Sequence, residues 1–389
     1  MVYPIGVDFG TTNSAMSVWQ DDRAQIIIPD NHPTLPSSLY VTRDGRMIVG
    51  HAAKKRAMQN PGRYLTSAKR YLGEDEVYWK ITDRIYTPIE VAASTLAQLK
   101  QSAEAFLGGE IIQEVVITIP SCFSPDQKRG LKLAGELGGL KILQIIPESI
   151  AAAISYGFQQ RQEQCLLIYD WGGGRFDVTI VEVHQHQFHI VATVGDAHLG
   201  GEDLDFPLIQ YLIERLSNQT ASNLERLQQL CQEGIMGIQT DKSAVSLDLL
   251  IAWQRLKEAA VEAKTELNSS PKALIYLPDI LGYSLSEEVL LATYNRLIQP
   301  LVDRTITKIE TVLQRAHLNA DDIDQVLLIG GSTHNLSVKE QITTMFQKSS
   351  IVEQAEAGIS LGAAIVAADI VSRQYDIPGD YLKNMNLIL

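Results

Sequence analysis

Residues 170–177 read Asp-Trp-Gly-Gly-Gly-Arg-Phe-Asp and follow a short apolar run at 165–169. Polar and apolar residues alternate from 177 to 183, so the pattern predicts two strands joined by a glycine turn. Three successive glycines carry no side chains, and several backbone N–H groups of the turn can therefore approach one anion closely. Acidic residues at both ends of such a turn are unfavourable beside a phosphate unless a cation lies between them. Asp170 and Asp177 thus indicate a magnesium ion, held mostly through water.

A second copy of this design lies near the N-terminus, where residues 5–14 read Ile-Gly-Val-Asp-Phe-Gly-Thr-Thr-Asn-Ser. It again combines an apolar strand, an aspartate, a glycine turn and hydroxyl groups that can bond phosphate oxygens. One Gly-Gly-Gly turn alone is more simply interpreted as a tight hairpin with two solvated aspartates. The duplication favours a binding function, because two such hairpins facing each other would clamp a polyphosphate from both sides.

The composition is that of a soluble globular protein. At 389 residues the chain is long for one core, which favours two or more domains. Its net charge of −13 disfavours non-specific binding to nucleic acid or to an anionic membrane. No apolar run approaches the ~20 residues that span a bilayer, and Met1 leads directly into the first hairpin without a signal sequence. We therefore expect a soluble, cytoplasmic protein.

The three cysteines, Cys122, Cys165 and Cys231, are odd in number, far apart and placed in apolar stretches. No two of them have the Cys-x-x-Cys spacing. They are expected to be reduced thiols in the core of a cytosolic protein.

The order of elements indicates a duplicated lobe. Apolar residues recur at helical spacing over 89–106, and residues 115–120 form a nearly continuous apolar strand of the kind buried on both faces. Residues 325–332 repeat that strand, and a helix from about Glu356 repeats one from Glu148. This order predicts an α/β chain with mostly parallel, covered sheets.

We expect two lobes that differ chiefly by an insertion with helical periodicity. The first lobe is predicted over residues 1–163, with a C-terminal helix at 357–376 that packs back onto it. The second lobe is predicted over 164–356 and includes the insertion at about 206–283. Residues 377–389 are expected to be a tail or the start of a linker.

Two lysine-bearing segments stand apart from the general surface charge. Lys69 lies in the sequence Ser-Ala-Lys-Arg-Tyr-Leu-Gly at 67–73, where a glycine ends a short helical pattern. In the insertion, Lys257, Val261 and Lys264 share one face of a helix whose other face carries an apolar stripe. That stripe consists of Leu249, Trp253, Leu256, Ala260, Ala263 and Leu267. Lysines on such a helix ordinarily serve solubility, and ligand binding is the less common interpretation.

Four segments together resemble motifs of the seventy-kilodalton heat-shock chaperone family: residues 7–14, 169–177, 195–203 and 328–333. Similar motifs at 67–73, 116–123 and 151–157 extend the resemblance over essentially the whole chain. Actin or sugar kinases share any one of these motifs, but the ordered set is specific. The resemblance is to the nucleotide-binding domain alone, and it implies an α/β, actin-like (ribonuclease H-like) two-lobed ATPase fold with duplicated mixed sheets and helical insertions. The family's β-rich peptide-binding domain is expected to be absent from this chain.

The resemblance also implies roles for individual residues. Asp8, Asp170 and Asp177 match the carboxylates that hold magnesium and potassium ions around the phosphates. Lys69 matches a catalytic lysine near the γ-phosphate, and Glu148 matches a glutamate that positions the water shell of the magnesium. The expected catalytic residues are Lys69, Glu148, Asp170, Asp177 and Arg175. The expected phosphate loops are Gly10, Thr11, Thr12 and Asn13, and Gly172, Gly173 and Gly174. The residues expected to bind the rest of the nucleotide are Gly200, Gly201, Glu202, Lys264, Gly330, Gly331, Ser332 and His334.

Four positions depart from the family pattern. Pro147-Glu148-Ser149 stands where the family usually has Asn-Glu-Pro, which moves the backbone restraint to the other side of the glutamate. Val261 replaces a glutamate that contacts the ribose, and His334 replaces an arginine that stacks on adenine. Arg175 replaces a threonine beside the γ-phosphate. We expect Arg175 to act on the phosphates, as a substitute for a monovalent ion or as a built-in arginine finger, rather than to turn to solvent or pair with a surface carboxylate.

The resemblance implies a chaperone-type domain that binds ATP or ADP with magnesium and potassium, hydrolyses ATP slowly and closes its lobes around the nucleotide. It also implies a J-domain co-chaperone and a nucleotide exchange factor as partners, and neither nucleic acid nor membrane. Two alternatives stay open. The departures at Arg175, Val261 and His334 support a nucleotide-sensing adaptor or pseudo-ATPase with little turnover. A small-molecule kinase on the same fold would need a sugar or acid pocket and a base between the lobes.

Overall fold

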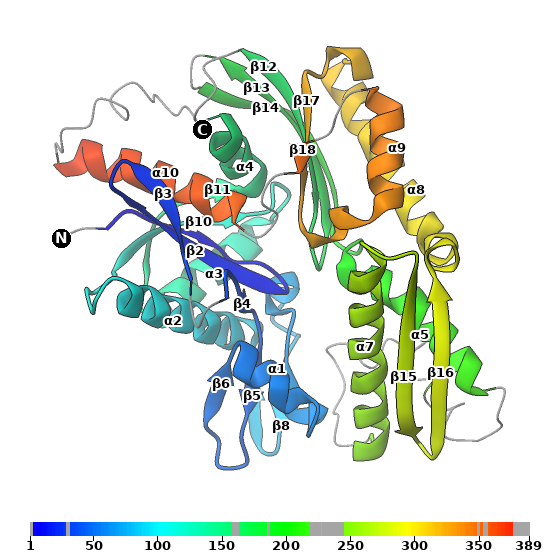
Figure 1. Cartoon of the computed structure of the whole chain (residues 1–389). Helices are drawn as coiled ribbons and strands as arrows, with labels where there is room; N and C mark the ends of the chain where they lie inside the picture. The colour runs from blue at the N-terminus through cyan, green and yellow to red at the C-terminus, as the bar shows by residue number, and fades with distance from the viewer. Residues whose placement is uncertain are drawn as a thin grey trace.

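Two mixed sheets, each containing one of the two glycine hairpins, form the frame of the molecule (Figure 1). In the computed structural model the described residues are 3–28, 32–157, 163–184, 187–217, 227, 245–347, 351–352 and 357–375. The predicted fold class is confirmed, because the chain is α/β and the two sheets repeat one arrangement of strands.

The first sheet contains the N-terminal hairpin. β1 (Ile5–Asp8) is antiparallel to β2 (Asn13–Gln20) and parallel to β10 (Glu114–Ile119), which in turn is parallel to β11 (Lys141–Pro147). The order across the sheet is β11-β10-β1-β2-β3, with β3 (Arg23–Ile27) at one edge and the short β4 (Leu35–Pro36) paired to β2. Residues 115–117 of β10 have no exposed surface, as the continuous apolar run predicted.

The second sheet repeats this arrangement around the Gly-Gly-Gly turn. β12 (Gln164–Trp171) and β13 (Phe176–His184) are antiparallel, with Asp170 directly opposite Asp177. β12 is parallel to β17 (Gln325–Ile329), just as β1 is parallel to β10. The order is β14-β13-β12-β17-β18, with β14 (Gln187–Asp196) and β18 (Ile351–Val352) at the edges.

Two helices, α4 (Glu148–Gly157) and α10 (Gly358–Tyr375), pack together between the sheets (Figure 1). Their alanine-rich faces share one core with residues of β10 and of β12, so each sheet buries one face on this helix pair. The helices approach until their backbones touch: a Cβ on Gly362 would overlap the carbonyl oxygen of Ala151, so the position requires glycine.

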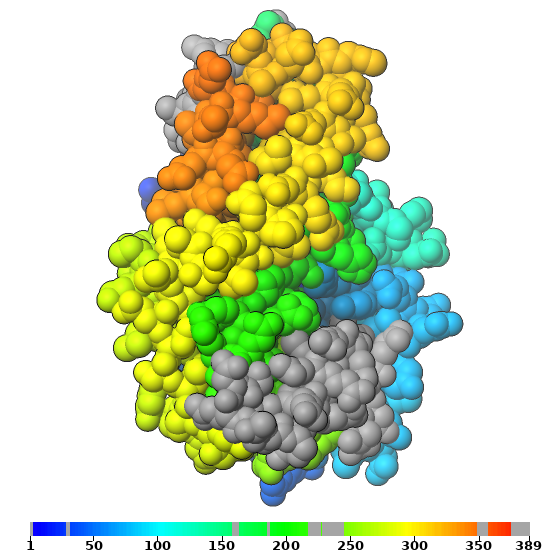
Figure 2. Space-filling model, turned by 90° about the vertical axis from the view of Figure 1, so that its right-hand side faces the viewer, coloured from blue at the N-terminus to red at the C-terminus, as the bar shows by residue number. Residues whose placement is uncertain are grey.

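Further helices cover the outer faces of the sheets. α2 (Pro88–Phe106) and α3 (Pro125–Leu137) pack on the first sheet. The start of α2 is fixed by Thr87, whose side chain accepts a hydrogen bond from the backbone of Glu90 while Glu90 caps Thr87 in return. On the second sheet lie α8 (Leu291–Ala316) and α9 (Leu336–Phe346), which form the yellow and orange upper part of the face seen in Figure 2.

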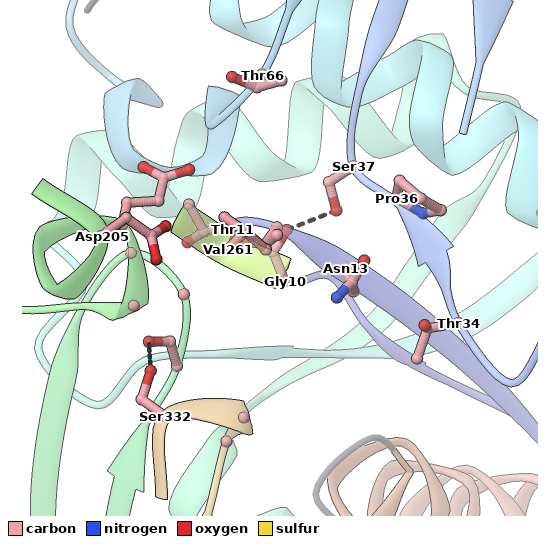
Figure 3. Close-up of a pocket in the computed structure, with 18 of the residues that line it drawn as sticks. Gly10, Thr11, Asn13, Thr34, Pro36, Ser37, Thr66, Asp205, Val261 and Ser332 are labelled. Carbon is pink, nitrogen blue, oxygen red and sulfur yellow. Dashed lines mark hydrogen bonds between the residues drawn. The ribbon is translucent and has the colours of Figure 1, made fainter. Parts of the chain in front are cut away.

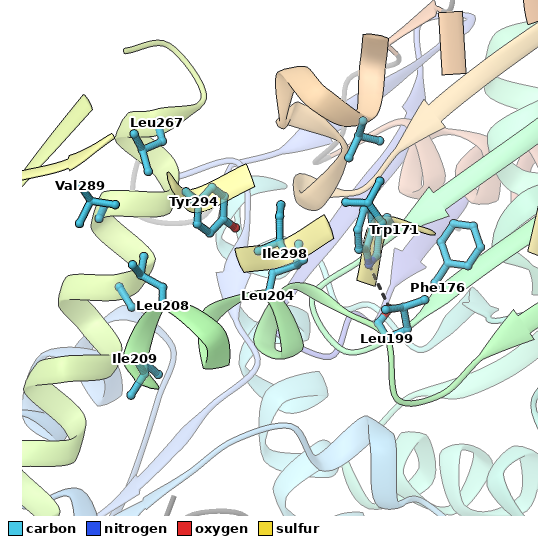
Figure 4. Packing of buried hydrophobic residues seen from close by; sticks show 14 of the residues in the cluster. Trp171, Phe176, Leu199, Leu204, Leu208, Ile209, Leu267, Val289, Tyr294 and Ile298 are labelled. Carbon is cyan, nitrogen blue, oxygen red and sulfur yellow. Dashed lines mark hydrogen bonds between the residues drawn. The ribbon is translucent and has the colours of Figure 1, made fainter. Parts of the chain in front are cut away.

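The expected insertion projects from the second sheet as α5 (Gly201–Ser217), α7 (Leu247–Leu267) and a hairpin of β15 (Lys272–Ile280) and β16 (Tyr283–Leu290). The predicted stripe of α7 faces the core: Leu256, Ala260, Ala263 and Leu267 are buried, and Leu249 and Trp253 pack against the same cluster. Figure 4 shows how this cluster joins α5 and α8 to the second sheet, where the indole N–H of Trp171 donates to the carbonyl of Leu199 over 3.0 Å. The hairpin was not expected in a segment of helical periodicity, and it extends past residue 283 to Leu290.

Small elements complete the first half of the chain and the connections of the second. They are β5 (Leu39–Val41), β6 (Met47–Val49), α1 (His51–Ala57), η2 (Pro61–Arg63), β7 (Tyr64–Leu65), η3 (Ala68–Tyr71), β8 (Trp79–Ile81), β9 (Arg84–Tyr86), η5 (Ala320–Asp322) and η6 (Gly331–His334). The C-terminal tail expected at 377–389 lies outside the described residues, as does Cys231. None of the helices in the described ranges is long and apolar enough to cross a membrane.

Candidate functional site

A cavity of about 470 Å³ lies between the two glycine hairpins and continues to the insertion. Its walls come from both halves of the chain: the β1–β2 turn, η3 and the start of α4 on one side, and the β12–β13 turn, α5, α7 and η6 on the other. In Figure 3, Thr11, Asn13 and Ser37 of the first half border this space together with Asp205 and Ser332 of the second. The volume falls within the range of about 300–1,000 Å³ that is usual for small-molecule sites.

The two hairpins face each other across one end of the cavity. A Cβ on Gly173 would overlap Oγ1 of Thr12, and a Cβ on Gly174 would lie 2.5 Å from Cγ2 of Thr11. Only glycine permits this approach, because any side chain would push the turns apart. The glycine run therefore serves the contact between the hairpins as well as the conformation of the turn itself.

Hydrogen bonds hold each turn in place. In the first hairpin the backbone N–H of Gly10 donates to Oγ of Ser14 over 3.1 Å, and Oγ of Ser37 donates to the carbonyl of Gly10 over 2.8 Å. In the second, the carbonyl of Gly172 accepts bonds from the N–H of Gly201 at 2.9 Å and from Oγ of Ser332 at 3.2 Å. The turns are thus fixed by groups outside them, and their shape is set before any ligand arrives.

Asp8 and Asp170 both line this end of the cavity, and within the described part of the chain neither has an ion-pair partner. Burial, followed by the charge of Glu148, raises the pKa of Asp8 to about 6. Burial also raises the pKa of Asp170 well above its ordinary value, and the charges of Glu148, Asp177 and Asp8 add to the rise. Two carboxylates that are costly to ionise together form a place where a cation would be stabilising.

Two of the residues expected to be catalytic, Lys69 and Glu148, form an ion pair. Nζ of Lys69, in η3, lies 2.6 Å from Oε1 of Glu148, the first residue of α4, and both side chains are nearly inaccessible to solvent. The altered Pro-Glu-Ser turn therefore still delivers the glutamate to the cavity wall. Proline at 147 ends β11, and Ser149 Oγ lies 3.0 Å from Oγ of Ser121.

Arg175 lines the cavity but is paired with Asp177. Its Nε donates to Oδ2 of Asp177 over 2.6 Å, and its guanidinium carbon lies 5.7 Å from the centre of the Phe123 ring. Asp177 itself is buried behind Arg175 and is not part of the cavity wall. The sequence did not predict this partner, because Asp177 was assigned to the metal. A guanidinium at Asp177 is compatible with the expected role of Arg175 as a substitute for a monovalent ion.

Cys122 was expected in the core, and this expectation is wrong. The residue is exposed, although its thiol faces inward and donates to Oδ1 of Asp177 over 2.8 Å, next to the guanidinium of Arg175. Burial of the thiol, and then the charge of Asp177, raise the pKa of Cys122 to about 12. Cys165 is partly buried against the core of the second sheet.

The structure brings most of the predicted nucleotide residues to the cavity wall. Those that line it are Asp8, Gly10, Thr11, Thr12, Asn13, Lys69, Glu148, Asp170, Gly172, Gly173, Gly174, Arg175, Gly201, Glu202, Lys264, Gly330, Gly331 and Ser332. Val261 and Lys257 line it as well, on the same face of α7 as Lys264. Asp177, Gly200 and His334 do not line it; Gly200 packs behind the second hairpin, against the backbone of Gly174.

Several wall residues were not predicted. They include Ser37, Ser38, Tyr64, Asp205, Gln254, Asn268 and Tyr294. Gln254 and Asn268 extend the α7 face of Lys257, Val261 and Lys264 by one turn in each direction, so helical spacing alone was a usable signal. Asp205 forms an ion pair with Lys264, whose Nζ also donates to the carbonyl of Gly201 over 2.9 Å. The buried hydroxyl of Tyr294 has no hydrogen-bond partner within the described ranges.

Ion pairs connect the two halves across the cavity mouth. Arg70, in η3, donates to Glu202 and to Asp203 of α5, each over 3.2 Å, and Oγ of Ser67 donates to Glu202 over 2.6 Å. Further along, Nζ of Lys54 lies 3.3 Å from a carboxylate oxygen of Glu258 on α7. These ion pairs and hydrogen bonds join the two halves of the chain around the cavity.

Comparison with known protein families agrees with this architecture. The family model described as Hsp70 protein matches residues 4–78 and 73–378, which is nearly all of the chain. Members of that family combine chaperone function with an ATP-binding, two-lobed domain of the actin-like type, and the paired sheets and facing glycine hairpins fit this description. The chain therefore belongs to the Hsp70 protein family.

Proposed function

We propose that this chain is a magnesium-dependent ATP-binding domain that hydrolyses ATP slowly and couples nucleotide binding to closure of its two halves. One observation carries the proposal: two glycine hairpins, related by the internal duplication, face each other across a cavity whose walls hold two carboxylates without ion-pair partners in the described chain. Family membership supports the ATPase class in general.

The residues present fit a bound magnesium ion. No three acidic, histidine or cysteine side chains among the described residues converge closely enough to hold a metal by themselves. Magnesium suits such a site, because it keeps several waters and is commonly held by one or two carboxylates together with substrate phosphates. Asp8 and Asp170 would hold it here, and its charge would offset both carboxylates and the phosphate oxygens.

The chain's own residues supply the remaining parts of phosphoryl-transfer chemistry, which depends on positioning and electrostatic stabilisation more than on covalent help. The N–H groups and hydroxyls of the two turns would bind phosphate oxygens. Lys69, held in place by Glu148, presents an ammonium group to the same end of the cavity. The α7 face of Val261 and Lys264, with Gly330 to Ser332, would receive the nucleoside.

We further propose that the two halves correspond to lobes at 1–163 and 164–356, with α10 packed back on the first. Nucleotide would hold them together in addition to the pairs Arg70–Glu202 and Lys54–Glu258, which already span the mouth. A cytoplasmic location, a J-domain co-chaperone and an exchange factor belong to this proposal through the family alone.

A pseudo-ATPase is the second candidate, and a specific observation favours it. Arg175 holds Asp177, which removes from the cavity one of the three aspartates expected to act there. A nucleotide sensor would bind ATP but not turn it over. A small-molecule kinase would transfer the phosphoryl group of ATP to an added acceptor faster than to water.

Single-turnover hydrolysis of ATP by the purified chain distinguishes these functions. The proposal expects magnesium-dependent binding of ATP and ADP, followed by slow release of phosphate that Lys69→Met abolishes. Tight binding without phosphate release would identify a nucleotide sensor. Absence of nucleotide binding in the presence of magnesium would contradict both.

A further inference from the structure

Four carboxylates lie at or directly behind the phosphate end of the cavity, and two of them already have a fixed cation. Glu148 pairs with Lys69 at 2.6 Å, and Asp177 pairs with Arg175 at 2.6 Å. Both pairs are sheltered from solvent, with exposed side-chain fractions of 4% and 10% in the first and 13% and 7% in the second. The charges left unbalanced are therefore those of two carboxylates, which is the charge of one divalent ion.

The backbone places Arg175 on Asp177 directly. Residues two apart in a strand point to the same side, and Arg175 leaves the glycine turn just as β13 begins at Phe176. Its guanidinium meets the carboxylate with two nitrogens, Nε to Oδ2 at 2.6 Å and Nη2 to Oδ1 at 3.4 Å. The ring of Phe123 flanks the guanidinium and shields the pair.

Asp177 has little room for any other ligand. Its Oδ1 accepts a hydrogen bond from the thiol of Cys122 at 2.8 Å. On a third side it abuts Gly195, where even a Cβ would overlap the carboxylate. Arg175 thus stands between Asp177 and the cavity, and of the two only Arg175 reaches the wall.

We propose that Arg175 is a permanent internal counter-ion that withdraws Asp177 from cation binding, so that the site takes one divalent ion at Asp8 and Asp170 and no second cation. The inference rests on the proposed function for the divalent ion, but the pairing itself is a property of the nucleotide-free protein. A second cation near Asp177 would have to enter against the guanidinium, and the carboxylate it would bind is already neutralised. Arg175 is a positioning residue in this proposal, because it acts through Asp177.

The test compares Arg175→Thr, Asp177→Asn and the double variant with the parent chain. The first measurement is the melting temperature of nucleotide-free protein in potassium, sodium or choline chloride at equal ionic strength. Arg175→Thr leaves Asp177 buried without a counter-charge, so the melting temperature is expected to fall and to rise again with potassium or sodium but not with choline. The parent and the double variant should show no such selectivity. Arg304→Gln, which breaks an ion pair with Asp196 on the outer side of the second sheet, is the matched control.

The second measurement counts cations. Titration of manganese(II), followed by electron paramagnetic resonance in the presence of ADP, is expected to give one bound ion in the parent and an unchanged affinity in Asp177→Asn. A large loss of manganese affinity in Asp177→Asn would show that Asp177 is a metal ligand and would overturn the inference, as would an Arg175→Thr protein that is indifferent to the cation. If Arg175→Thr does not fold, Arg175→Gln, which also removes the positive charge but keeps an amide donor for Asp177, gives the same comparison with the double variant. Failure of the parent to bind manganese and ADP would instead contradict the proposed function, while leaving the melting comparison intact.

Discussion

The ammonium group of Lys69 and the carboxylate of Glu148 form a buried ion pair, 2.6 Å apart, that joins η3 to the first turn of α4. Breaking a buried pair by removing one partner commonly costs about 3–5 kcal/mol, because the other charge stays buried. We expect Lys69→Met to lower the free energy of unfolding by about that amount. Denaturant unfolding measures this, and the double variant Lys69→Met with Glu148→Gln should recover much of the loss. Equal stability of the single and double variants would contradict the role of charge burial.

Asp8 and Asp170 are the two carboxylates of the site without ion-pair partners in the described chain, and removal of either should weaken metal-dependent nucleotide binding. Asp170→Asn is expected to reduce the affinity for magnesium and ADP by at least the roughly 10–100-fold that is typical even of outer-shell groups. Calorimetry with and without magnesium measures the change. A similar loss in Asp170→Asn and Asp177→Asn would support three equivalent ligands, and an unchanged affinity would mean that the hairpins are only structural.

The raised pKa of Asp8 predicts a pH dependence with a definite sign. The ordinary value of 3.8 applies to the unfolded chain and about 6 to the folded one, so between these values the folded protein binds more protons. Asp8 therefore stabilises the nucleotide-free fold most at low pH, and this contribution falls as the pH rises from 3.8 to about 6. Magnesium binds the ionised carboxylate of Asp8. Stabilisation of the fold by magnesium and ADP should therefore appear as the pH rises above about 6. Thermal melting across this range, compared with Asp8→Asn, checks both trends; an identical pH profile in the variant would contradict them.

The nucleoside end of the cavity offers a gain-of-affinity test. Val261 lines the wall but cannot accept a hydrogen bond from a ribose hydroxyl. Val261→Glu is expected to tighten ADP binding, since a hydrogen bond to a charged group contributes about 1.5–3 kcal/mol. His334→Arg should have a smaller effect, because His334 lies off the cavity wall. The family pattern marks both positions as departures that weaken contacts with the nucleoside, whereas the cavity geometry distinguishes them, so calorimetry of the two single variants shows whether the geometry decides.

The contact between the hairpins can be tested at one glycine. In Gly173→Ala the new methyl group would overlap Thr12, so the turns must separate and nucleotide affinity should fall sharply. Gly157→Ala is the matched control, because a Cβ at this position at the end of α4 meets the ring of Phe188 at an ordinary 3.5 Å. Retention of full affinity in Gly173→Ala would mean that the turns do not need this approach to bind phosphate.

The fold was predictable from the sequence because its strongest signals are local and repeated. Turn glycines and apolar strands each act within a few residues, and the duplication indicated that the two hairpins face each other. The two glycine turns of the cavity wall followed from the same repeats, whereas most of the other predicted wall residues followed from the resemblance to the chaperone family. The β15–β16 hairpin escaped detection because Leu274 and Tyr276 on its exposed face are apolar too, which hides the alternation of a half-buried strand.

The electrostatic details of the site could not be read from residue order. Arg175 starts beside the phosphate turn in every interpretation, and only its rotamer decides whether it meets a phosphate or Asp177. Cys122 looked like a core residue because it closely follows the apolar run at 115–120, whereas its thiol is held by a carboxylate 55 positions later in the chain. His334 shares a motif with the cavity residue Ser332, but it turns away with the η6 helix.

The close contact at Gly362 also has a mechanical meaning. α4 begins at Glu148, and its backbone touches α10 without an intervening side chain that could deform. We therefore expect a displacement of α10 at this contact to move α4 as well, and with it the carboxylate of Glu148 that holds Lys69. Through this contact, the position of α10, the last described helix of the chain, is coupled to the position of Glu148 at the phosphate site.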